Sequence, residues 1–392
     1  MERADRRFGL FVCAVVCAGV GFVAIAGNLS PPVGPIAPTM KTLDQVEPRV
    51  PINATNTPGD SNSSFRITQP GSYYLTGNIT GVTARHGIEI AASGVTIDLN
   101  GFDMVGIPAS LDAVNASDFN LTNITIMNGS IRSWGGDGID LATASVSSTR
   151  ISGITSDSNG GRGIAVGNQS VITGCIVRSC VGLGIVTGNS AMVSSSTCQA
   201  NMPGGFLSGT DCVFSNCNAR TNSDYGFTIG TGTVMTNCTA YSNAAEGIIA
   251  NTHCEITGCV ASVNTDNGIV VAGSCTVSGN TCNANGFAGV IAAGIAVNGI
   301  YNTVIGNHCD DNDFGIDVND GANKIDGNSC SHNNINFDII GVDNFVVRNT
   351  ATGGVPNYNI AAGNSVAPRI SVTGQDPWTA AGSSNPWANF GY

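Results

Sequence analysis

The side chains best suited to chemistry in this chain are acidic, and they gather in one stretch near its C-terminal end. Asp317 and Asp338 are 21 residues apart. If a repeat of that length stacks them in neighbouring coils, they lie about 4.8 Å from each other. Carboxylates so close either share a proton, as a general acid and base would, or hold a hard cation through their oxygens. The stretch comprises His308, Asp310, Asp311, Asp313, Asp317, Asp320, Asp326, Asp338 and Asp343.

Three interpretations of this acidic stretch stay open. In the catalytic interpretation, Asp317 and Asp338 are the acid and the base. In the metal interpretation, a Ca²⁺ ion takes its oxygen ligands from Asp310, Asp311, Asp313, Asp317 and Asp338. In the third, the aspartates and the asparagines between them are turn residues that are solvated and idle.

A second set of polar residues follows the same spacing and predicts a binding site. The set is Arg178, Gln199, Arg220 and Tyr241, each 21 residues after the one before. Stacked in successive coils, the two arginines would lie about 10 Å apart. They could then bind successive carboxylates of an acidic glycan, unless they are merely solvated. A sparser acidic site is expected toward the other end of the chain, in a column made of Glu89, Asn115 and Asp140.

An internal repeat must position these residues. Each repeat begins with a glycine followed by an aliphatic residue or Phe, at Gly163, Gly184, Gly205, Gly226, Gly247 and Gly268. After an insertion the series resumes at Gly294, Gly315, Asn336 and Asn357. Within a unit, short runs of period 2 are separated by Gly, Asn and Ser, which is typical of strands joined by tight turns. Upstream, Gly87, Ala113 and Gly138 begin similar units of about 25 residues. The resulting thirteen units predict an all-β solenoid of parallel strands, a rod roughly 60 Å long.

Two kinds of residue recur as columns inside this repeat. Asn201, Asn222, Asn243, Asn264 and Asn285 predict a ladder of side-chain amides along the rod. Cysteines form the other columns: Cys175, Cys217, Cys238 and Cys259 in one, Cys212, Cys254 and Cys275 in another, and Cys282, Cys309 and Cys330 in a third. We expect these thiols to pack in the core. Disulfides remain the alternative because exported chains favour them, and zinc is disfavoured because no C-x-x-C pair occurs.

Composition and chain ends narrow the class of protein. With 15 Lys and Arg against 27 Asp and Glu, the surface repels phosphate, so nucleic-acid binding is excluded. Residues 1–26 combine early arginines, an uncharged run and an Ala-x-Ala end, which predicts a secretory signal. An uncleaved membrane anchor is the alternative. The predicted organisation is a signal at 1–26, a Pro-rich linker at 27–64, a single β-solenoid domain at 65–375 and a tail at 376–392. The location would be secreted or cell-surface.

The coil length, the Asn ladder and the Gly-hydrophobic coil start resemble the right-handed parallel β-helix proteins of the pectin-lyase-like superfamily. Three segments, at 67–81, 86–106 and 385–392, are similar to secreted bacterial β-helix repeat proteins of this kind. The resemblance implies the fold. It does not imply one activity, since the superfamily holds lyases, hydrolases, esterases, epimerases and proteins without catalytic activity. The Asp-Pro-His-Glu run of alginate epimerases and the Gly-His-Gly of polygalacturonases do not occur in this sequence.

Three functional classes therefore remain. The first is a secreted or cell-surface β-helix protein without catalytic activity that binds an extracellular glycan. The second is a polysaccharide lyase, hydrolase or epimerase that departs from the known motifs. The third is a trimeric fibre or spike segment. Trimerisation requires an apolar stripe along the rod, and the sequence predicts polar outward positions.

Overall fold

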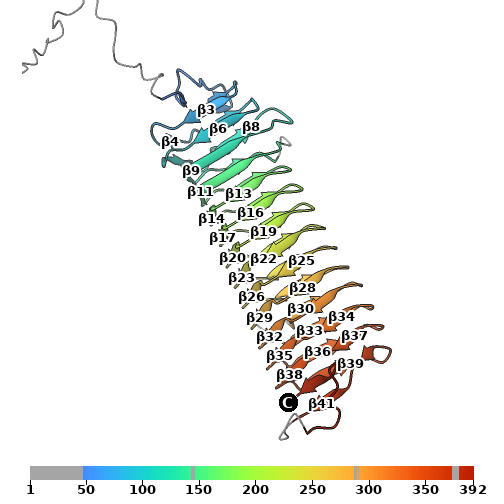
Figure 1. The fold of residues 1–392 in the computed structure, drawn as a ribbon. Coiled ribbons are helices and arrows are strands. Elements are labelled where there is room, and N and C mark those ends of the chain that lie inside the picture. Colours follow the sequence, from blue (N-terminus) through green and yellow to red (C-terminus); the bar gives the residue numbers. More distant parts are fainter. Residues whose placement is uncertain (1–46, 143–145, 287–288, 290, 373–378) are drawn as a thin grey trace, which may run out of the picture. The chain divides into compact units, whose positions relative to one another are not determined.

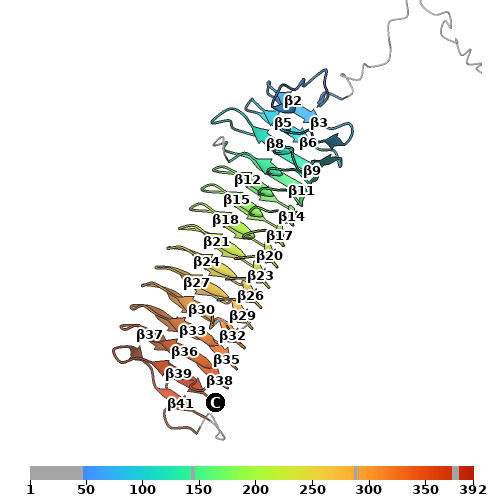
Figure 2. The same ribbon diagram turned by 180° about the vertical axis from the view of Figure 1, so that it is seen from behind.

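The protein is described by a computed structural model that covers residues 47–142, 146–286, 289, 291–372 and 379–392. The predicted signal at 1–26 and most of the predicted linker lie outside the described residues. Residues Arg49–Tyr392 form one compact unit, a parallel β-solenoid (Figures 1 and 2). No helix long and apolar enough to cross a membrane is found among the residues that the structure describes.

Each regular coil contributes one strand to a 14-stranded parallel sheet, which we call the small sheet. The coil that begins at Gly247, for example, places β24 between the equivalent strands of the coils before and after it. The strands of the small sheet are β2 (Ser63–Ile67), β5 (His86–Ile90), β8 (Val114–Ala116), β10 (Ile139–Asp140), β12 (Ile164–Val166), β15 (Ile185–Thr187), β18 (Phe206–Ser208), β21 (Phe227–Ile229), β24 (Ile248–Ala250), β27 (Ile269–Val271), β30 (Ala293–Val297), β33 (Phe314–Val318), β36 (Ile335–Ile339) and β39 (Tyr358–Ile360).

The rest of each regular coil contributes two strands to a 28-stranded sheet, which we call the large sheet. The first of the two is β13 (Val171–Thr173), β16 (Met192–Ser194), β19 (Val213–Ser215), β22 (Val234–Thr236), β25 (Glu255–Thr257), β28 (Thr276–Ser278), β31 (Thr303–Ile305), β34 (Lys324–Asp326) or β37 (Phe345–Val347). The second is β14 (Ile176–Arg178), β17 (Thr197–Gln199), β20 (Asn218–Arg220), β23 (Thr239–Tyr241), β26 (Val260–Ser262), β29 (Thr281–Asn283), β32 (His308–Asp310), β35 (Ser329–Ser331) or β38 (Thr350–Thr352).

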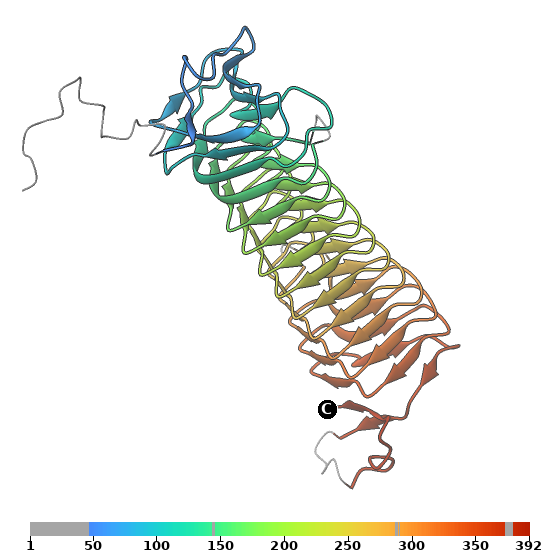
Figure 3. The ribbon, with the colours of Figure 1, turned by 45° about the horizontal axis from the view of Figure 1, so that its top comes forward.

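The remaining strands of the large sheet belong to the two ends of the solenoid. At the N-terminal end they are β1 (Val50–Pro51), β3 (Gly71–Tyr74), β4 (Ile79–Thr80), β6 (Val95–Asp98), β7 (Asp103–Val105), β9 (Thr125–Arg132) and β11 (Arg150–Asp157). At the C-terminal end they are β40 (Ser365–Val366), β41 (Arg369–Ser371) and β42 (Asn389–Gly391). Figure 3 shows how the coils of the solenoid stack on one another.

The aliphatic and Phe residues that follow the repeat-starting glycines or asparagines form a column in the core. Its members are at most 1% exposed, and they are Ile164, Ile185, Phe206, Phe227, Ile248, Ile269, Ile295, Ile316 and Phe337. Register pairs each of them with its equivalent in the next coil. The rings of Phe206 and Phe227 stack with centroids 4.6 Å apart. Burying one apolar side chain in each coil on each sheet gives the solenoid a continuous core.

The coil turns at three corners that share one local design. At each corner a residue with positive φ precedes a side chain that points inward, as in Ser242 (φ 56°) before Asn243. The backbone N of Asn243 donates to Oδ1 of Asn264 in the next coil at 3.1 Å, and its Nδ2 donates to the same oxygen at 2.9 Å. The predicted Asn ladder is therefore confirmed, and it continues through Asn312 to Asn333.

The cysteine columns occupy the other corners and the strand interiors. All twelve cysteines from Cys175 to Cys330 are buried and free. Two of these cysteine columns continue, in the next coil, as further Asn ladders. One column continues after Cys259. The other continues after Cys275, where Cys275 N donates to Asn302 Oδ1 at 2.8 Å. The core interpretation of the cysteines thus agrees with the structure. Burial raises the pKa of Cys175 to about 11.

The structure extends the predicted solenoid at both ends. The small sheet has 14 strands, and the solenoid has about 16 turns in all, against about thirteen predicted coils. Before residue 65, β1 already pairs in parallel with β3. After residue 375, β42 pairs with β38 and β41, and Asn389 accepts a hydrogen bond from Asn349 N at 2.9 Å as the next member of an Asn ladder. These segments lack the 21-residue spacing, but they cover sheet edges that would otherwise be unpaired.

Candidate functional site

The register of the large sheet brings two of the predicted sites into one line. Outward-facing residues at equivalent positions of successive coils form a column that runs along the rod at steps of about 4.8 Å. We call it the polar column. It consists of Arg132, Asp157, Arg178, Gln199, Arg220, Tyr241, Ser262, Asn283, Asp310 and Ser331. The second strands that carry it lie side by side along one edge of the view in Figure 1.

Strand alternation explains why these side chains face outward. In β20, Ala219 is buried in the core while Asn218 and Arg220 lie on the outer surface. The next residue, Thr221 (φ 51°), turns the corner, and Asn222 points inward again as a member of the Asn ladder. The rigid ladder therefore fixes the end of the strand and the position of the outward residue before it.

The arginines of the polar column differ in their partners. Arg132 is ion-paired with Asp103 at 2.6 Å, and Arg178 is ion-paired with Asp157 at 2.9 Å. Arg220 instead donates from Nη2 to Gln199 Oε1 at 2.9 Å, and it takes part in none of the ion pairs found among the described residues. The ring of Tyr241, which is 46% exposed, follows Arg220 in the next coil. The predicted residues Arg178, Gln199, Arg220 and Tyr241 are thus brought together as one exposed strip.

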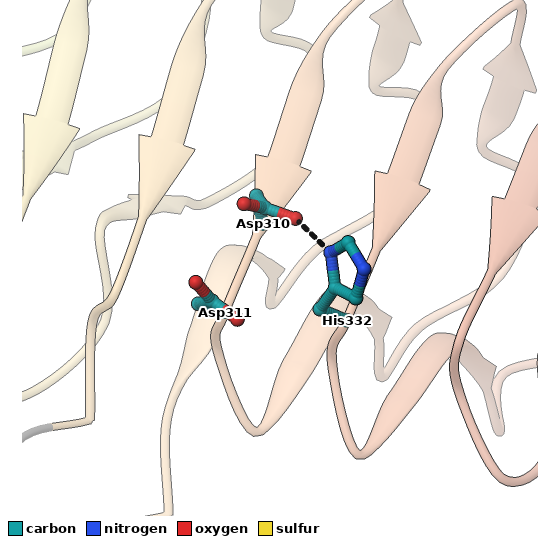
Figure 4. A group of neighbouring side chains, drawn as sticks. All are labelled: Asp310, Asp311 and His332. Carbon is teal, nitrogen blue, oxygen red and sulfur yellow. Dashed lines mark hydrogen bonds and ion pairs between the residues drawn. The ribbon is translucent and has the colours of Figure 1, made fainter.

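Further along the same column, Asp310 belongs to a cluster with Asp311 and His332 (Figure 4). Asp311 and His332 occupy the same corner in successive coils, with φ of 55° and 52°. His332 Nδ1 lies 2.9 Å from Asp310 Oδ1, which also accepts a hydrogen bond from Ser331 Oγ. One ligand atom from each of the three residues lies within 4.8 Å of the others. Two carboxylates and an imidazole suit a borderline transition metal better than Ca²⁺.

The charges within this cluster stabilise one another. The hydrogen bond with Asp310 raises the pKa of His332, and the negative charge of Asp310 adds to this effect. Partial burial raises the pKa of Asp310, but the hydrogen bonds from Ser331 and His332 outweigh it and leave this pKa below its usual value. The sequence did not lead us to expect His332 at this site. Its position 21 residues after Asp311, one repeat length, could have indicated that the two residues are neighbours.

The predicted five-ligand calcium site is not formed. Asp310 ends β32 of the large sheet and Asp311 forms the corner after it, whereas Asp317 and Asp338 lie on β33 and β36 of the small sheet. The corner at Asp311 separates the two faces, so these carboxylates face different sides of the solenoid. Asp313 accepts hydrogen bonds from Asn334 Nδ2 at 2.7 Å and from Ala292 N at 3.2 Å, which is a structural role.

Asp317 and Asp338 are register partners, as the spacing predicted. Asp317 Oδ2 accepts a hydrogen bond from Asn319 Nδ2 at 3.0 Å, whereas its Oδ1 is buried and has no hydrogen-bond partner among the residues that the structure describes. Burial raises the pKa of Asp317, and the nearby charge of Asp338 raises it further. This pair is therefore an isolated pair of like charges on the small sheet.

The sparser acidic column near the N-terminal end is neutralised by arginines that the sequence analysis did not pair with it. Glu89, Asn115 and Asp140 are in register as predicted. Arg66 Nε lies 2.8 Å from Glu89 Oε1, although without the angle of a hydrogen bond. Arg162 Nη2 lies 3.1 Å from Asp140 Oδ2. Both carboxylates of this column therefore already have a guanidinium partner.

The outward column of the small sheet differs from the prediction of polar outward positions. Between residues 165 and 296 its members are mostly apolar: Ala165, Val186, Leu207, Thr228, Ile249, Val270 and Ala296. A groove of about 390 Å³ lies over Thr228, Ile249 and Val270. The sequence argument against trimerisation, which relied on a polar surface, is therefore wrong for this face.

Comparisons with known proteins support the fold. No family model matches the chain, and no curated protein matches it. A mutant tailspike protein of E. coli bacteriophage HK620, solved in complex with a pentasaccharide, is 13% identical with a TM-score of 0.54, over 89% of this chain and 79% of that chain. The A-module of the mannuronan C-5 epimerase AlgE4 from Azotobacter vinelandii is 16% identical with a TM-score of 0.41, over 76% of this chain and 87% of that chain. The parallel strand pairing and the likeness to the tailspike protein show the parallel β-helix fold, and in that fold the chain resembles the pectin-lyase-like proteins.

Proposed function

We propose that this protein is secreted or displayed at the cell surface and binds an acidic polysaccharide along the polar column. The observation that carries the proposal is Arg220, an exposed guanidinium with an amide partner, Gln199, and no carboxylate partner within the described part of the chain. A cation held in place by a neutral group keeps its charge available for an incoming carboxylate. The neighbouring ring of Tyr241 offers a surface for the apolar face of a sugar.

The linear arrangement supports a polymer as the ligand. Successive coils repeat the outward position at steps of about 4.8 Å, so Arg178 and Arg220 lie two steps apart, about 10 Å. A chain of sugar residues that runs parallel to the rod axis meets these cations at regular intervals. Arg178 takes part less strongly, because Asp157 already neutralises it at 2.9 Å.

A second candidate function is a glycan-cleaving enzyme that acts at Asp317 and Asp338. The observation that favours it is the raised pKa of Asp317 beside a second carboxylate, which suits a general acid. The polar column could not hold a glycan against Asp317 and Asp338, because this pair lies on the other sheet. Glycan binding without cleavage is therefore the function that the geometry supports best.

The test is affinity electrophoresis in gels that contain pectate, alginate or neutral dextran. We expect wild-type protein to be retarded by at least one acidic polysaccharide, and Arg220→Gln to lose most of that retardation. Arg150→Gln is the matched control, since Arg150 is also exposed but lies at the start of β11, outside the polar column. Release of reducing ends or unsaturated products would favour the enzyme. Equal retardation of both variants would contradict the proposal.

A further inference from the structure

The last described segment, 379–392, builds a pocket at the C-terminal end of the solenoid. β42 joins the large sheet between β38 and β41, and Trp387, two residues before β42, lies beside Phe345 and Val347 of β37. Arg348 N donates to Trp387 O at 3.0 Å, and the Arg348 guanidinium lies 5.1 Å from the centroid of the Trp387 ring. Asp326 holds the same guanidinium through Nε at 2.6 Å. The Trp387 indole is thus held in place by the hydrogen bond to its backbone and by the Arg348 guanidinium on one face.

Phe345 and Trp387 stand beside one cavity of about 420 Å³. The cavity is also lined by Val347, Ser365, Pro368 and Asn385, so its lining carries no charged side chain. Phe345 is 44% exposed and Trp387 is 50% exposed. The exposure of two aromatic rings to water is unfavourable. A ligand that covered the rings would remove this unfavourable exposure.

We propose that this cavity binds a neutral sugar ring, with the apolar face of the ring against Trp387 and Phe345. The volume lies within the range of small-molecule sites, which combine apolar and aromatic walls with a few polar groups. Ser365 and Asn385 supply such groups, a hydroxyl and an amide, suited to sugar hydroxyls. The absence of charge from the lining favours a neutral ring over a uronate. Asn385 Oδ1 already accepts a hydrogen bond from Trp387 N at 2.9 Å, so Asn385 Nδ2 and the Ser365 hydroxyl are the groups that an aliphatic chain could not hydrogen-bond.

This site extends the proposed function but does not depend on the polar column. Phe345 and Val347 lie on a first strand of the large sheet, and the corner at Arg348 (φ 58°) separates them from the second strand that continues the polar column. The two sites therefore lie on different sides of the coil. They also differ in ligand class, because the polar column offers a free guanidinium and the cavity offers aromatic faces.

The experiment measures retardation of the full chain in gels with dextran, hydroxyethylcellulose or galactomannan, with alginate as the acidic comparison. We expect at least one neutral polysaccharide to retard wild-type protein, and Trp387→Ala to weaken its apparent affinity at least about fivefold. Trp387→Tyr should restore most of the affinity. Phe119→Ala is the matched control, since Phe119 is 75% exposed and lies far along the chain from the cavity.

The outcomes separate the two sites. Arg220→Gln should leave retardation by the neutral polysaccharide unchanged, and Trp387→Ala should leave retardation by alginate unchanged. If Trp387→Ala lowers the melting temperature, retardation of Phe345→Ala is measured in its place. Phe345 faces outward, so its substitution leaves the Asn ladders intact. Failure of all three neutral polysaccharides to retard wild type would overturn the inference, as would equal retardation of Trp387→Ala and Phe119→Ala.

Discussion

Cys259 and Asn280 occupy the same corner in successive coils, and the backbone N of Cys259 donates to Asn280 Oδ1 at 2.8 Å. One coil earlier, Cys238 N donates to Cys259 Sγ at 3.4 Å. Cys259 is thus the coil at which a column of mainly thiols passes into a ladder of asparagines. The cysteine column, in which Ser196 accepts a hydrogen bond from Cys175 N at 3.2 Å, and this Asn ladder are a single structural element.

This relationship predicts how Cys259 responds to substitution. Cys259→Ala should lower the free energy of unfolding by about 2 kcal/mol, because it leaves a cavity and removes the acceptor of Cys238 N. Cys259→Asn should stay within about 1 kcal/mol of wild type, since it extends the ladder by one coil. Urea denaturation measures both. As a control, Cys198→Ala should cost less, because its partner in the next coil is already Ala219. An asparagine variant less stable than the alanine variant would contradict the shared ladder.

A second prediction concerns the redox state of the cysteines. The protein, denatured without reductant, should present about twelve reactive thiols from the cysteines between Cys175 and Cys330. In the native state these thiols should react slowly at pH 8, because all twelve are buried away from the reagent. Burial also raises the pKa of Cys175 to about 11, which keeps that thiol protonated. Thiol titration with and without denaturant measures both. Fewer than about four thiols in the denatured chain would refute core packing as the general explanation.

A third prediction concerns the ion pair between His332 and Asp310. The pKa of His332 is raised, so its contribution to stability is present below its unfolded value of about 6.5 and is lost as pH rises through the folded value. The pKa of Asp310 is lowered, so its contribution is present above about 3.9 and is lost in acid. The pair therefore stabilises most between about pH 4 and 6.5. NMR titration of the histidine ring should give a pKa above 6.5, and Asp310→Asn should return it to the ordinary value.

A fourth prediction separates the interpretations of Asp317. Its raised pKa means that the ionised form is disfavoured in the folded protein, so stability falls as pH rises through the folded value. Asp317→Asn should therefore raise the melting temperature at pH 7, by on the order of 1 °C, and have little effect near pH 3. Asp320→Asn, at an exposed position, is the control. A lower melting temperature for Asp317→Asn, or a calcium-dependent rise of the wild type that this variant abolishes, would show that the carboxylate has a ligand.

The fold could be predicted because one spacing dominates the middle of the chain. Residues such as Ile248 and Asn243 recur every 21 positions, and burial on a shared axis requires that recurrence. The continuation of the polar column from Asn283 to Asp310 could not be predicted, because an insertion lengthens that step to 27 residues. The approach of Trp387 to Phe345 has no periodic signal at all, since it depends on how the last strand pairs.

The repeat spacing also determined which candidate sites could be predicted from the sequence. Arg178, Gln199, Arg220 and Tyr241 follow the period and proved to be neighbours. The five aspartates of the predicted calcium site were grouped by closeness in sequence, and the corner at Asp311 sends them to different faces. Closeness along the chain is a poor guide in a solenoid, where residues one period apart are closer in space than residues on two sides of a corner.

The most direct test of glycan binding along the polar column is calorimetry with oligouronates of increasing length, at low and at physiological salt. We predict that affinity rises with length, that salt weakens it, and that Arg220→Gln reduces it about tenfold while Arg150→Gln leaves it unchanged. Absence of binding at every length, or equal affinities for the two variants, would contradict the account.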